Sequence, residues 1–193
     1  MKIGVLALQG AFIEHIKAMQ RLGAEAVPVR RPDELKGLDG LIIPGGESTA
    51  ILNLMASYKL LRPLKELARA DFPIWGTCAG MVCLARRVSS PNSAGTKTLS
   101  AMNMVVKRNA FGRQVDSFET ELKMTALGDK PFPAVFIRAP IIESAEPPVE
   151  IMAKLDDGTI VAARQGRLLA TAFHPELTAD LRLHRYFLKT ITG

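Results

Sequence analysis

The sequence has 193 residues, of which 48% are hydrophobic and 23% are charged. This composition is typical of a folded globular protein and excludes a disordered chain, and about 150 residues per domain predicts one domain over residues 1–193. A chain of this length can form its core without disulfide or metal support. No apolar run approaches the roughly 20 residues that span a bilayer, and the N-terminal residues lack a signal-peptide pattern. We therefore expect a cytoplasmic protein with no membrane contact.

The chain carries 25 basic and 19 acidic side chains, which gives a net charge of +6. The basic residues are spread along the chain and do not alternate with aromatic residues, so we interpret them as a solvated surface and expect no nucleic-acid partner. The two cysteines, Cys78 and Cys83, have neither the spacing of a redox pair nor that of a zinc site. We expect reduced cysteines and no bound metal.

Apolar runs of strand length alternate with segments of helical periodicity in the first half of the chain. The expected strands cover residues 3–8, 26–29, 41–43 and 72–75. The expected helices cover residues 12–22, 48–55 and 61–70, and a fourth helix ends at Leu84. Strands that are apolar throughout and alternate with helices indicate a parallel sheet with helices on both faces.

The second half of the chain is dominated by short strands. Residues 87–100 are rich in small polar residues, glycine and proline, and are expected to form an exposed loop. Residues 156–158 (Asp-Asp-Gly) predict a hairpin turn, and a last helix is expected over residues 179–190. The expected strands cover residues 104–106, 118–122, 134–137, 149–152, 159–162 and 168–171. The predicted fold class is a single-domain, three-layer α/β sandwich with a mostly parallel central sheet and additional antiparallel strands in the second half.

Residues 76–80 read Gly-Thr-Cys-Ala-Gly and lie between an apolar strand and an apolar helix. This is the cysteine form of the nucleophile elbow, in which flanking glycines let the backbone pass closely at a sharp turn. The sulfur of Cys78 would then lie at a helix N-terminus, which favours the nucleophilic thiolate, and the N–H of Ala79 would be free to stabilise an oxyanion. The alternative is a small buried cysteine in an ordinary turn.

A cysteine nucleophile requires a base, and the chain has three histidines. His174 and Glu176 follow the strand over residues 168–171, and residues two apart in extended chain point to the same side. Cys78, His174 and Glu176 thus have the order of nucleophile, base and orienting carboxylate, although a loop histidine beside a solvated glutamate is the alternative. His15 and His184 are interpreted as histidines on helix surfaces because charged residues flank them.

Residues 44–49 read Pro-Gly-Gly-Glu-Ser-Thr and follow the expected strand over residues 41–43. Adjacent glycines expose backbone N–H groups that can stabilise an oxyanion or bind a carboxylate, and the lysine of a P-loop is missing. The alternative is a tight turn with Ser48 as the helix N-cap. Ligands bind at the carboxyl ends of parallel strands, where this loop, the elbow and Gln9 would meet.

These motifs resemble a known family. Residues 76–80, 44–48 and 173–176 together resemble the class I, triad-type glutamine amidotransferases. Residues 8–11, 108–118 and 136–140 are similar, more specifically, to the glutaminase subunits of pyridoxal 5′-phosphate synthases. The resemblance extends from Leu8 to Leu177, and residues 87–102 depart from it by being longer and more polar than the family pattern.

The resemblance implies a mechanism in which Cys78 attacks the side-chain amide of glutamine and forms a thioester. His174 would act as base and acid, Glu176 would orient it, and the N–H groups of Gly46 and Ala79 would hold the oxyanion. The family's glutamine-binding positions fall on Gly46, Glu47, Ser48, Arg108, Ile137 and Arg138. An arginine suits this substrate because it pairs with an α-carboxylate.

The resemblance also implies a partner. Family glutaminases are nearly idle alone and pass ammonia to a barrel-shaped synthase subunit, in an assembly of twelve copies of each. Pyridoxal 5′-phosphate would be the product of that assembly and not a cofactor of this chain. Two alternatives remain: a glutaminase of another synthase or a γ-glutamyl hydrolase on the same fold, and a scaffold or regulatory module without catalysis.

Overall fold

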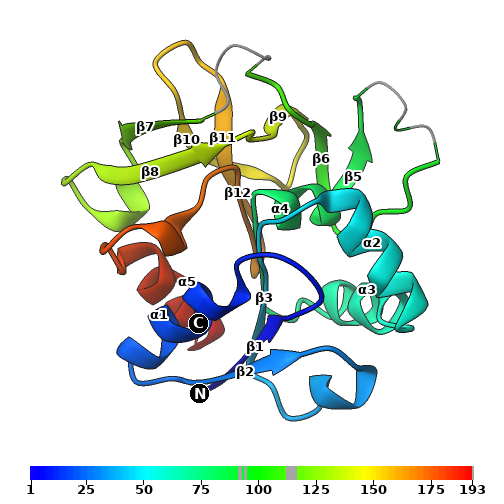
Figure 1. Ribbon diagram of the computed structural model, residues 1–193. Helices are drawn as coiled ribbons and strands as arrows, with labels where there is room; N and C mark the ends of the chain where they lie inside the picture. The colour runs from blue at the N-terminus through cyan, green and yellow to red at the C-terminus, as the bar shows by residue number, and fades with distance from the viewer. Residues whose placement is uncertain (91–92, 94, 112–116, 193) are drawn as a thin grey trace.

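A ten-stranded sheet runs through the described part of the molecule, and helices cover both of its faces (Figure 1). The computed structural model describes residues 1–90, 93, 95–111 and 117–192. The strands follow the order β2-β1-β3-β4-β12-β11-β9-β6-β5, and β10 pairs with β11 beside this path. A separate two-stranded antiparallel ribbon consists of β7 (Ser117–Leu122) and β8 (Phe132–Ile137).

One half of the large sheet is parallel. Its members are β1 (Lys2–Leu6), β2 (Glu25–Val29), β3 (Gly40–Ile43), β4 (Ile74–Thr77) and β12 (Leu168–Thr171). In register, Trp75 of β4 lies between Ile42 of β3 and Leu169 of β12. Parallel strands end at a common edge, so the segments that follow β1, β3, β4 and β12 meet there.

The other half of the sheet is mixed. Its members are β5 (Ala85–Val88), β6 (Met102–Lys107), β9 (Ile141–Ala145), β10 (Glu150–Lys154) and β11 (Ile160–Gln165). β11 pairs antiparallel with β12, β9 and β10, and β6 pairs antiparallel with β9. The predicted fold class, with a mostly parallel sheet joined to antiparallel strands, is confirmed. The predicted hairpin turn joins β10 to β11, where the N–H of Leu155 donates to the carbonyl of Thr159.

The helices divide between the two faces of the sheet. α1 (Phe12–Arg21) and α5 (Arg182–Thr192) lie on the left of the sheet in Figure 1. α2 (Ser48–Ser57), α3 (Leu61–Arg69) and α4 (Ala79–Leu84) lie on the right. Short 3-10 turns are η1 (Pro32–Leu35), η2 (Thr125–Leu127) and η3 (Pro175–Leu177). The three layers of the predicted sandwich are therefore present.

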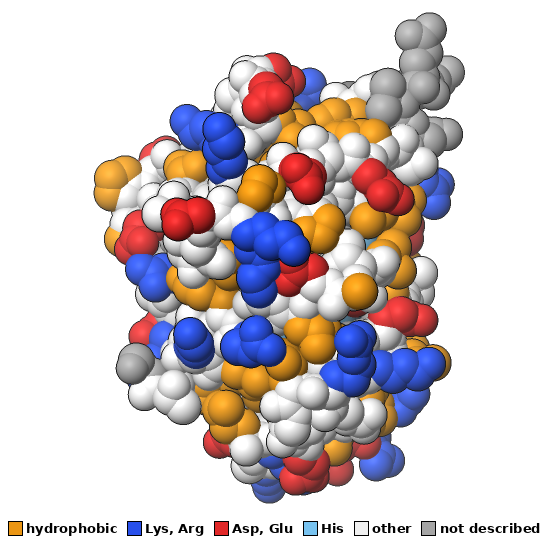
Figure 2. Space-filling view, turned by 90° about the vertical axis from the view of Figure 1, so that its left-hand side faces the viewer, with side chains coloured by type: hydrophobic (Ala, Val, Ile, Leu, Met, Phe, Trp, Pro, Cys, Tyr) orange, Lys and Arg blue, Asp and Glu red, His pale blue; other side chains and the backbone are white. Residues whose placement is uncertain are grey.

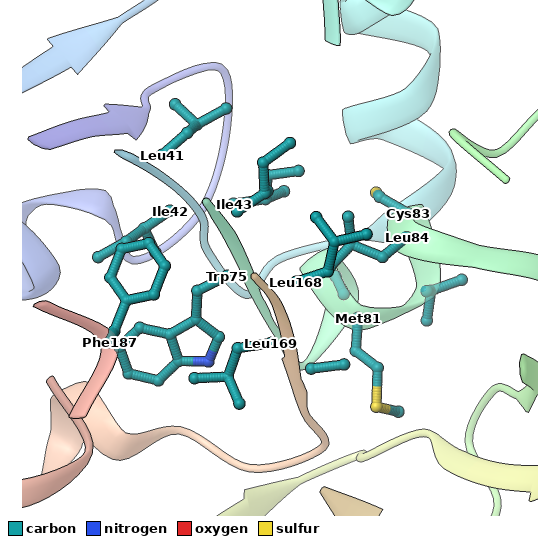
Figure 3. Packing of buried hydrophobic residues seen from close by; sticks show 14 of the residues in the cluster. Leu41, Ile42, Ile43, Trp75, Met81, Cys83, Leu84, Leu168, Leu169 and Phe187 are labelled. Atoms are coloured by element: carbon teal, nitrogen blue, oxygen red, sulfur yellow. The ribbon is translucent and has the colours of Figure 1, made fainter. Parts of the chain in front are cut away.

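The core packs against both faces of β4. Figure 3 shows Trp75 beside Phe187 of α5, while Met81 and Leu84 of α4 lie on the other side. The ring centroids of Trp75 and Phe187 are 5.7 Å apart. These four side chains are fully buried. Burying one phenylalanine contributes about 1.5–3 kcal/mol, so the contact between β4 and α5 fixes the C-terminal helix firmly to the sheet.

Three expectations for the elements were wrong in detail. Residues 87–100 do not form a simple exposed loop, because Arg87 belongs to β5 and the described residues Ser90, Thr98 and Leu99 are buried. The Thr98 hydroxyl donates to the carbonyl of Ala85. This hydrogen bond lets a polar side chain be buried in a segment whose composition predicts exposure to solvent. β9 was not expected, and α5 begins at Arg182 rather than at residue 179.

The surface carries its charges in a mixed pattern. On the face shown in Figure 2, lysine and arginine side chains are interspersed with acidic and apolar ones. This agrees with the interpretation of the +6 charge as a solvated basic surface. None of the helices in the described residues has the length and apolarity needed to cross a membrane.

Candidate active site

Cys78 occupies the turn that joins β4 to α4. Its backbone has φ 48° and ψ −106°, a left-handed conformation that a residue with a Cβ rarely adopts. The flanking glycines allow this turn to pack: a Cβ on Gly76 would collide with the backbone of Gly80, and a Cβ on Gly80 would collide with the carbonyl of Ile43. The sequence therefore forms the sharp strand-to-helix turn that the motif predicts, with the sulfur at the edge of the sheet.

His174 and Glu176 meet directly behind this turn. Nδ1 of His174 lies 2.7 Å from Oε1 of Glu176, and both residues are buried. We had expected an extended chain to bring the two side chains to the same side. Instead, the 3-10 turn η3 begins directly after His174, and this turn brings Glu176 next to the imidazole. The backbone N–H of His174 also donates to the carbonyl of Val135, which ties the backbone at His174 to β8.

The two side chains shift each other's pKa in opposite directions. Burial works to lower the pKa of His174, but hydrogen bonding to Cys78 and Glu176 outweighs it and raises that pKa to about 10. Burial works to raise the pKa of Glu176, but His15 and His174 outweigh it and hold that pKa well below its ordinary value. The site therefore stabilises a carboxylate beside an imidazole that binds a proton strongly, as the base that takes the proton of a thiol must.

A cavity of about 630 Å³ opens in front of Cys78. It is within the size range of small-molecule sites. All the predicted site residues except Glu176 line it: Gly46, Glu47, Ser48, Cys78, Ala79, Arg108, Ile137, Arg138 and His174. Glu176 lies behind His174, as an orienting residue should. The cavity is also lined by Gln9, Val82, Ser90, Lys107, Asn109 and Pro140, of which the sequence had placed Gln9 alone at this edge.

The loop before α2 is held by Gln9 and Glu47. Oε1 of Gln9 accepts the N–H of Glu47 at 2.8 Å. Glu47 is the N-cap of α2, since its carboxylate accepts the N–H groups of Thr49 at 2.9 Å and Ala50 at 2.7 Å. The alternative with Ser48 as N-cap is therefore wrong. Burial works against the charge, but these backbone donors hold the pKa of Glu47 below its ordinary value.

Two arginines, Arg108 and Arg138, also line the cavity. Nη1 of Arg108 donates to the Thr49 hydroxyl at 2.9 Å, and its backbone N–H donates to Oγ of Ser90 at 2.6 Å. Arg138 is exposed and has a φ of 42°. Ser90 was missed because it lies in the segment expected to be an exposed loop. The predicted motif over residues 108–118 reaches into residues 112–116, which lie outside the described residues.

His15 and His184 are fully buried, so their interpretation as surface histidines was wrong. Sequence neighbours on a helix point about 100° apart, so charged residues beside a histidine do not show which way it faces. The spacing between a histidine and the apolar residues three or four positions away indicates its direction better. His15 shares the buried face of α1 with Ala18 and Met19, and His184 shares that of α5 with Phe187 and Leu188.

The assembled groups can perform acyl transfer. A thiol on an elbow, an imidazole base and an ionised carboxylate form a nucleophilic system, and Ala79 lies in the first turn of α4, where N–H groups have no acceptor within the helix. Within the described residues, no three histidine, cysteine or acidic side chains are grouped so as to hold a metal ion. The thiol, the imidazole and the carboxylate suit attack by sulfur on a carbonyl carbon.

Comparisons with known proteins agree with this chemistry. The curated Pyridoxal 5′-phosphate synthase subunit PdxT of Dehalococcoides mccartyi strain 195 is 61% identical over 189 residues, covering 98% of this chain and 96% of that protein. The protein of the same name from Moorella thermoacetica is 57% identical over 191 residues, covering 99% of this chain and 100% of that protein.

A solved structure also matches closely. A crystal structure described as a glutamine amidotransferase is 44% identical, covers 99% of both chains and superposes with a TM-score of 0.93. A family model described as the SNO glutamine amidotransferase family matches residues 5–193. From this match and the near full-length relatives, we conclude that the chain belongs to the SNO glutamine amidotransferase family.

Proposed function

We propose that this protein is the glutaminase subunit of a pyridoxal 5′-phosphate synthase. It hydrolyses L-glutamine to L-glutamate and ammonia, and the ammonia is passed to a synthase subunit that builds the coenzyme, the active form of vitamin B6. What most supports this is the buried 2.7 Å contact between His174 and Glu176 behind Cys78, at the wall of a cavity of suitable size. The relatives are named as pyridoxal 5′-phosphate synthase subunits, and this supports the assignment to the synthesis of that coenzyme.

The reaction begins at Cys78. Its sulfur attacks the amide carbon of glutamine while His174 takes the thiol proton, and a tetrahedral intermediate forms. His174 then gives that proton to the leaving nitrogen, so the C–N bond breaks, ammonia departs and a γ-glutamyl thioester remains. Water, deprotonated by His174, attacks the thioester and releases glutamate and the thiol. Glu176 orients the imidazole by accepting its Nδ1–H throughout.

Backbone donors stabilise the charge that develops on the amide oxygen. The N–H of Ala79, directly after the nucleophile, and the N–H of Gly46, on the facing loop, are the two donors. Both residues line the cavity beside Cys78. The hydrogen bond from the Glu47 N–H to Gln9 ties the Gly46 loop to the segment that follows β1.

The remaining cavity residues hold the amino-acid end of glutamine. Arg108 and Arg138 provide positive charge for the α-carboxylate. Glu47 and Ser48 offer oxygens to the α-ammonium group, and Ile137 contributes an apolar wall. The carbonyl of Ile137 lies 4.0 Å from Sγ of Cys78, so this residue is close to the reacting atoms.

The protein works in the cytoplasm as part of a larger assembly. Its partner is a barrel-shaped synthase subunit, with twelve copies of each subunit in the complex. The chain itself is a single domain over residues 1–193, needs no cofactor, and contributes to pyridoxal 5′-phosphate only through its partner. Neither nucleic acid nor a membrane takes part.

The test is glutamate release from L-glutamine, measured with and without the synthase subunit. Activity that appears or rises strongly with that subunit supports the proposal. Equal activity without it would favour an independent hydrolase on the same fold, or a glutaminase of another synthase. Absence of activity in both conditions would favour the scaffold alternative.

Replacing Gly45 with alanine is expected to abolish most of this activity. A Cβ there would collide with Cε1 of His174 and lie 3.1 Å from its Nδ1 and 3.3 Å from Cβ of Cys78. The imidazole would have to move, and displacing a catalytic group by about 1 Å costs about 100-fold in rate. The measurement is kcat for glutamine hydrolysis in the complex.

Gly23→Ala is the matched control for that substitution. Gly23 has a φ of 80°, and a Cβ there would meet nothing within 4 Å, so alanine costs conformational energy of about 1 kcal/mol without touching the site. We expect Gly23→Ala to lower Tm and keep kcat. If Gly45→Ala keeps kcat as well, the assignment of this loop to the active site is wrong.

A further inference from the structure

A chain of buried polar contacts continues beyond Glu176, away from the cavity. Nε2 of His15 lies 3.3 Å from Oε2 of Glu176 and 3.2 Å from Oγ1 of Thr77. Nδ1 of His15 lies 3.1 Å from Nε2 of His184. Trp75 packs edge-on against both imidazoles. The contacts join α1 and α5, which lie on the same face of the sheet in Figure 1, to η3 and the end of β4.

The hydrogen-bond partners determine where the imidazole protons lie. An ionised carboxylate only accepts hydrogen bonds, so the Nε2 of His15 that faces Glu176 carries a proton. Nδ1 of His15 then accepts the Nε2–H of His184. Nδ1 of His184 has no hydrogen-bond partner among the described residues, and a lone pair there is tolerated better than an orphaned N–H. Burial lowers the pKa of His184 to about 3, which keeps this imidazole neutral.

We propose that His15 is a positioning residue for glutamine hydrolysis, and that its Nε2–H holds Oε2 of Glu176 so that Oε1 stays directed at His174. This inference rests on the proposed glutaminase function. His15 touches neither the cavity nor the reacting atoms, so it acts through Glu176. His184 supports it by donating to Nδ1, which keeps the His15 proton on the side of the carboxylate.

The burial of Glu176 explains why such a residue is needed. The Glu176 side chain is wholly buried, and its Oε2 has no partner with full hydrogen-bond geometry among the described residues. The Nε2–H of His15, shared with Thr77, is the donor nearest to it in the contacts that the structure shows. Burial works to raise the pKa of Glu176, and His15 and His174 both work to lower it. Without His15, a buried carboxylate would lose the support that keeps it ionised.

Two variants of His15 separate positioning from packing. His15→Gln places an amide nitrogen near the position of Nε2, facing Glu176. His15→Asn has a similar polarity, but its shorter side chain places the amide near Nδ1, facing His184. We expect His15→Asn to lower kcat about 10- to 100-fold, the range for leaving a buried charged group without its nearest donor, with KM nearly unchanged. His15→Gln should restore kcat to within a few-fold of the wild type.

The assay uses the protein in complex with the synthase subunit, with Tm recorded for each variant. Equal kcat for the two variants, or a loss of kcat that follows the loss of Tm, would overturn the inference. Wild-type protein without glutaminase activity would instead contradict the proposed function.

A spectroscopic measurement decides the same point without turnover. The chain has three histidines, so 15N-histidine labelling gives three imidazole spin systems, which single-histidine variants assign. We expect His15 and His184 both to be protonated at Nε2 at neutral pH, with Nδ1 of His184 unprotonated. A His15 ring whose Nε2 is unprotonated would overturn the inference, whatever the activity of the protein.

Discussion

Replacing Cys78 with alanine is expected to lower glutamine hydrolysis by about 10⁴-fold or more, because the nucleophile of a triad cannot be replaced by the remaining groups. The fold should survive, since alanine occupies the same left-handed position with a Cβ of the same size. Binding of the synthase subunit should also survive, because Cys78 is only 6% exposed and faces the cavity. The measurements are glutamate release and the Kd of the complex.

Cys83→Ala is the matched control for that substitution. Cys83 lies in α4, five residues after Cys78, and is fully buried. Burial raises the pKa of its thiol to about 12. Its sulfur therefore stays protonated and has no access to substrate. We expect this variant to lose stability while keeping its turnover number. Turnover retained by Cys78→Ala, or lost equally in both variants, would contradict the triad.

The parallel half of the sheet and the site edge could be predicted because the sequence encodes them locally. Apolar runs mark β3 and β4, and the glycines around Cys78 mark a turn that side chains would block. The rule that ligands bind at the carboxyl ends of parallel strands then brings the Gly46 loop and Cys78 together. The meeting of the Gly46 loop and Cys78 therefore follows from these local features, and no contact between distant side chains has to be known.

Features that depend on pairing between distant segments could not be predicted in this way. His15 and His184 are 169 positions apart, and only the packing of α1 and α5 on one face makes each the other's partner. Likewise, Thr98 is buried because it reaches the carbonyl of Ala85, which a composition rule for loops cannot show. Capping by Glu47 rather than Ser48 depends on the entry angle of the chain into α2.

The buried histidines also make stability depend on pH in two opposite ways. The pKa of His184 is lowered by burial to about 3 from an ordinary 6.5, so between these values the unfolded chain holds a proton that the folded protein lacks. Unfolding then becomes easier as the pH falls. His174, with its pKa raised to about 10, stabilises the fold fully below pH 6.5 and loses that contribution as the pH rises toward 10. Stability should therefore be greatest near neutral pH.

His184→Gln is expected to flatten the acid side of this curve. Glutamine can still donate a hydrogen bond to Nδ1 of His15, but it takes up no proton. One fully bound proton contributes about 1.4 kcal/mol per pH unit, and the unfolded histidine is half protonated at pH 6.5. The wild type should therefore lose about 1.6 kcal/mol more of its unfolding free energy than the variant between pH 6.5 and 5. Urea denaturation at each pH measures this difference.

Glu176 contributes little to stability changes between pH 6.5 and 5. The stability that its lowered pKa provides is lost only as the pH falls below the ordinary glutamate pKa of 4.5. Equal slopes for the two proteins would show that His184 is protonated in the fold, which would also remove the proton arrangement inferred for His15.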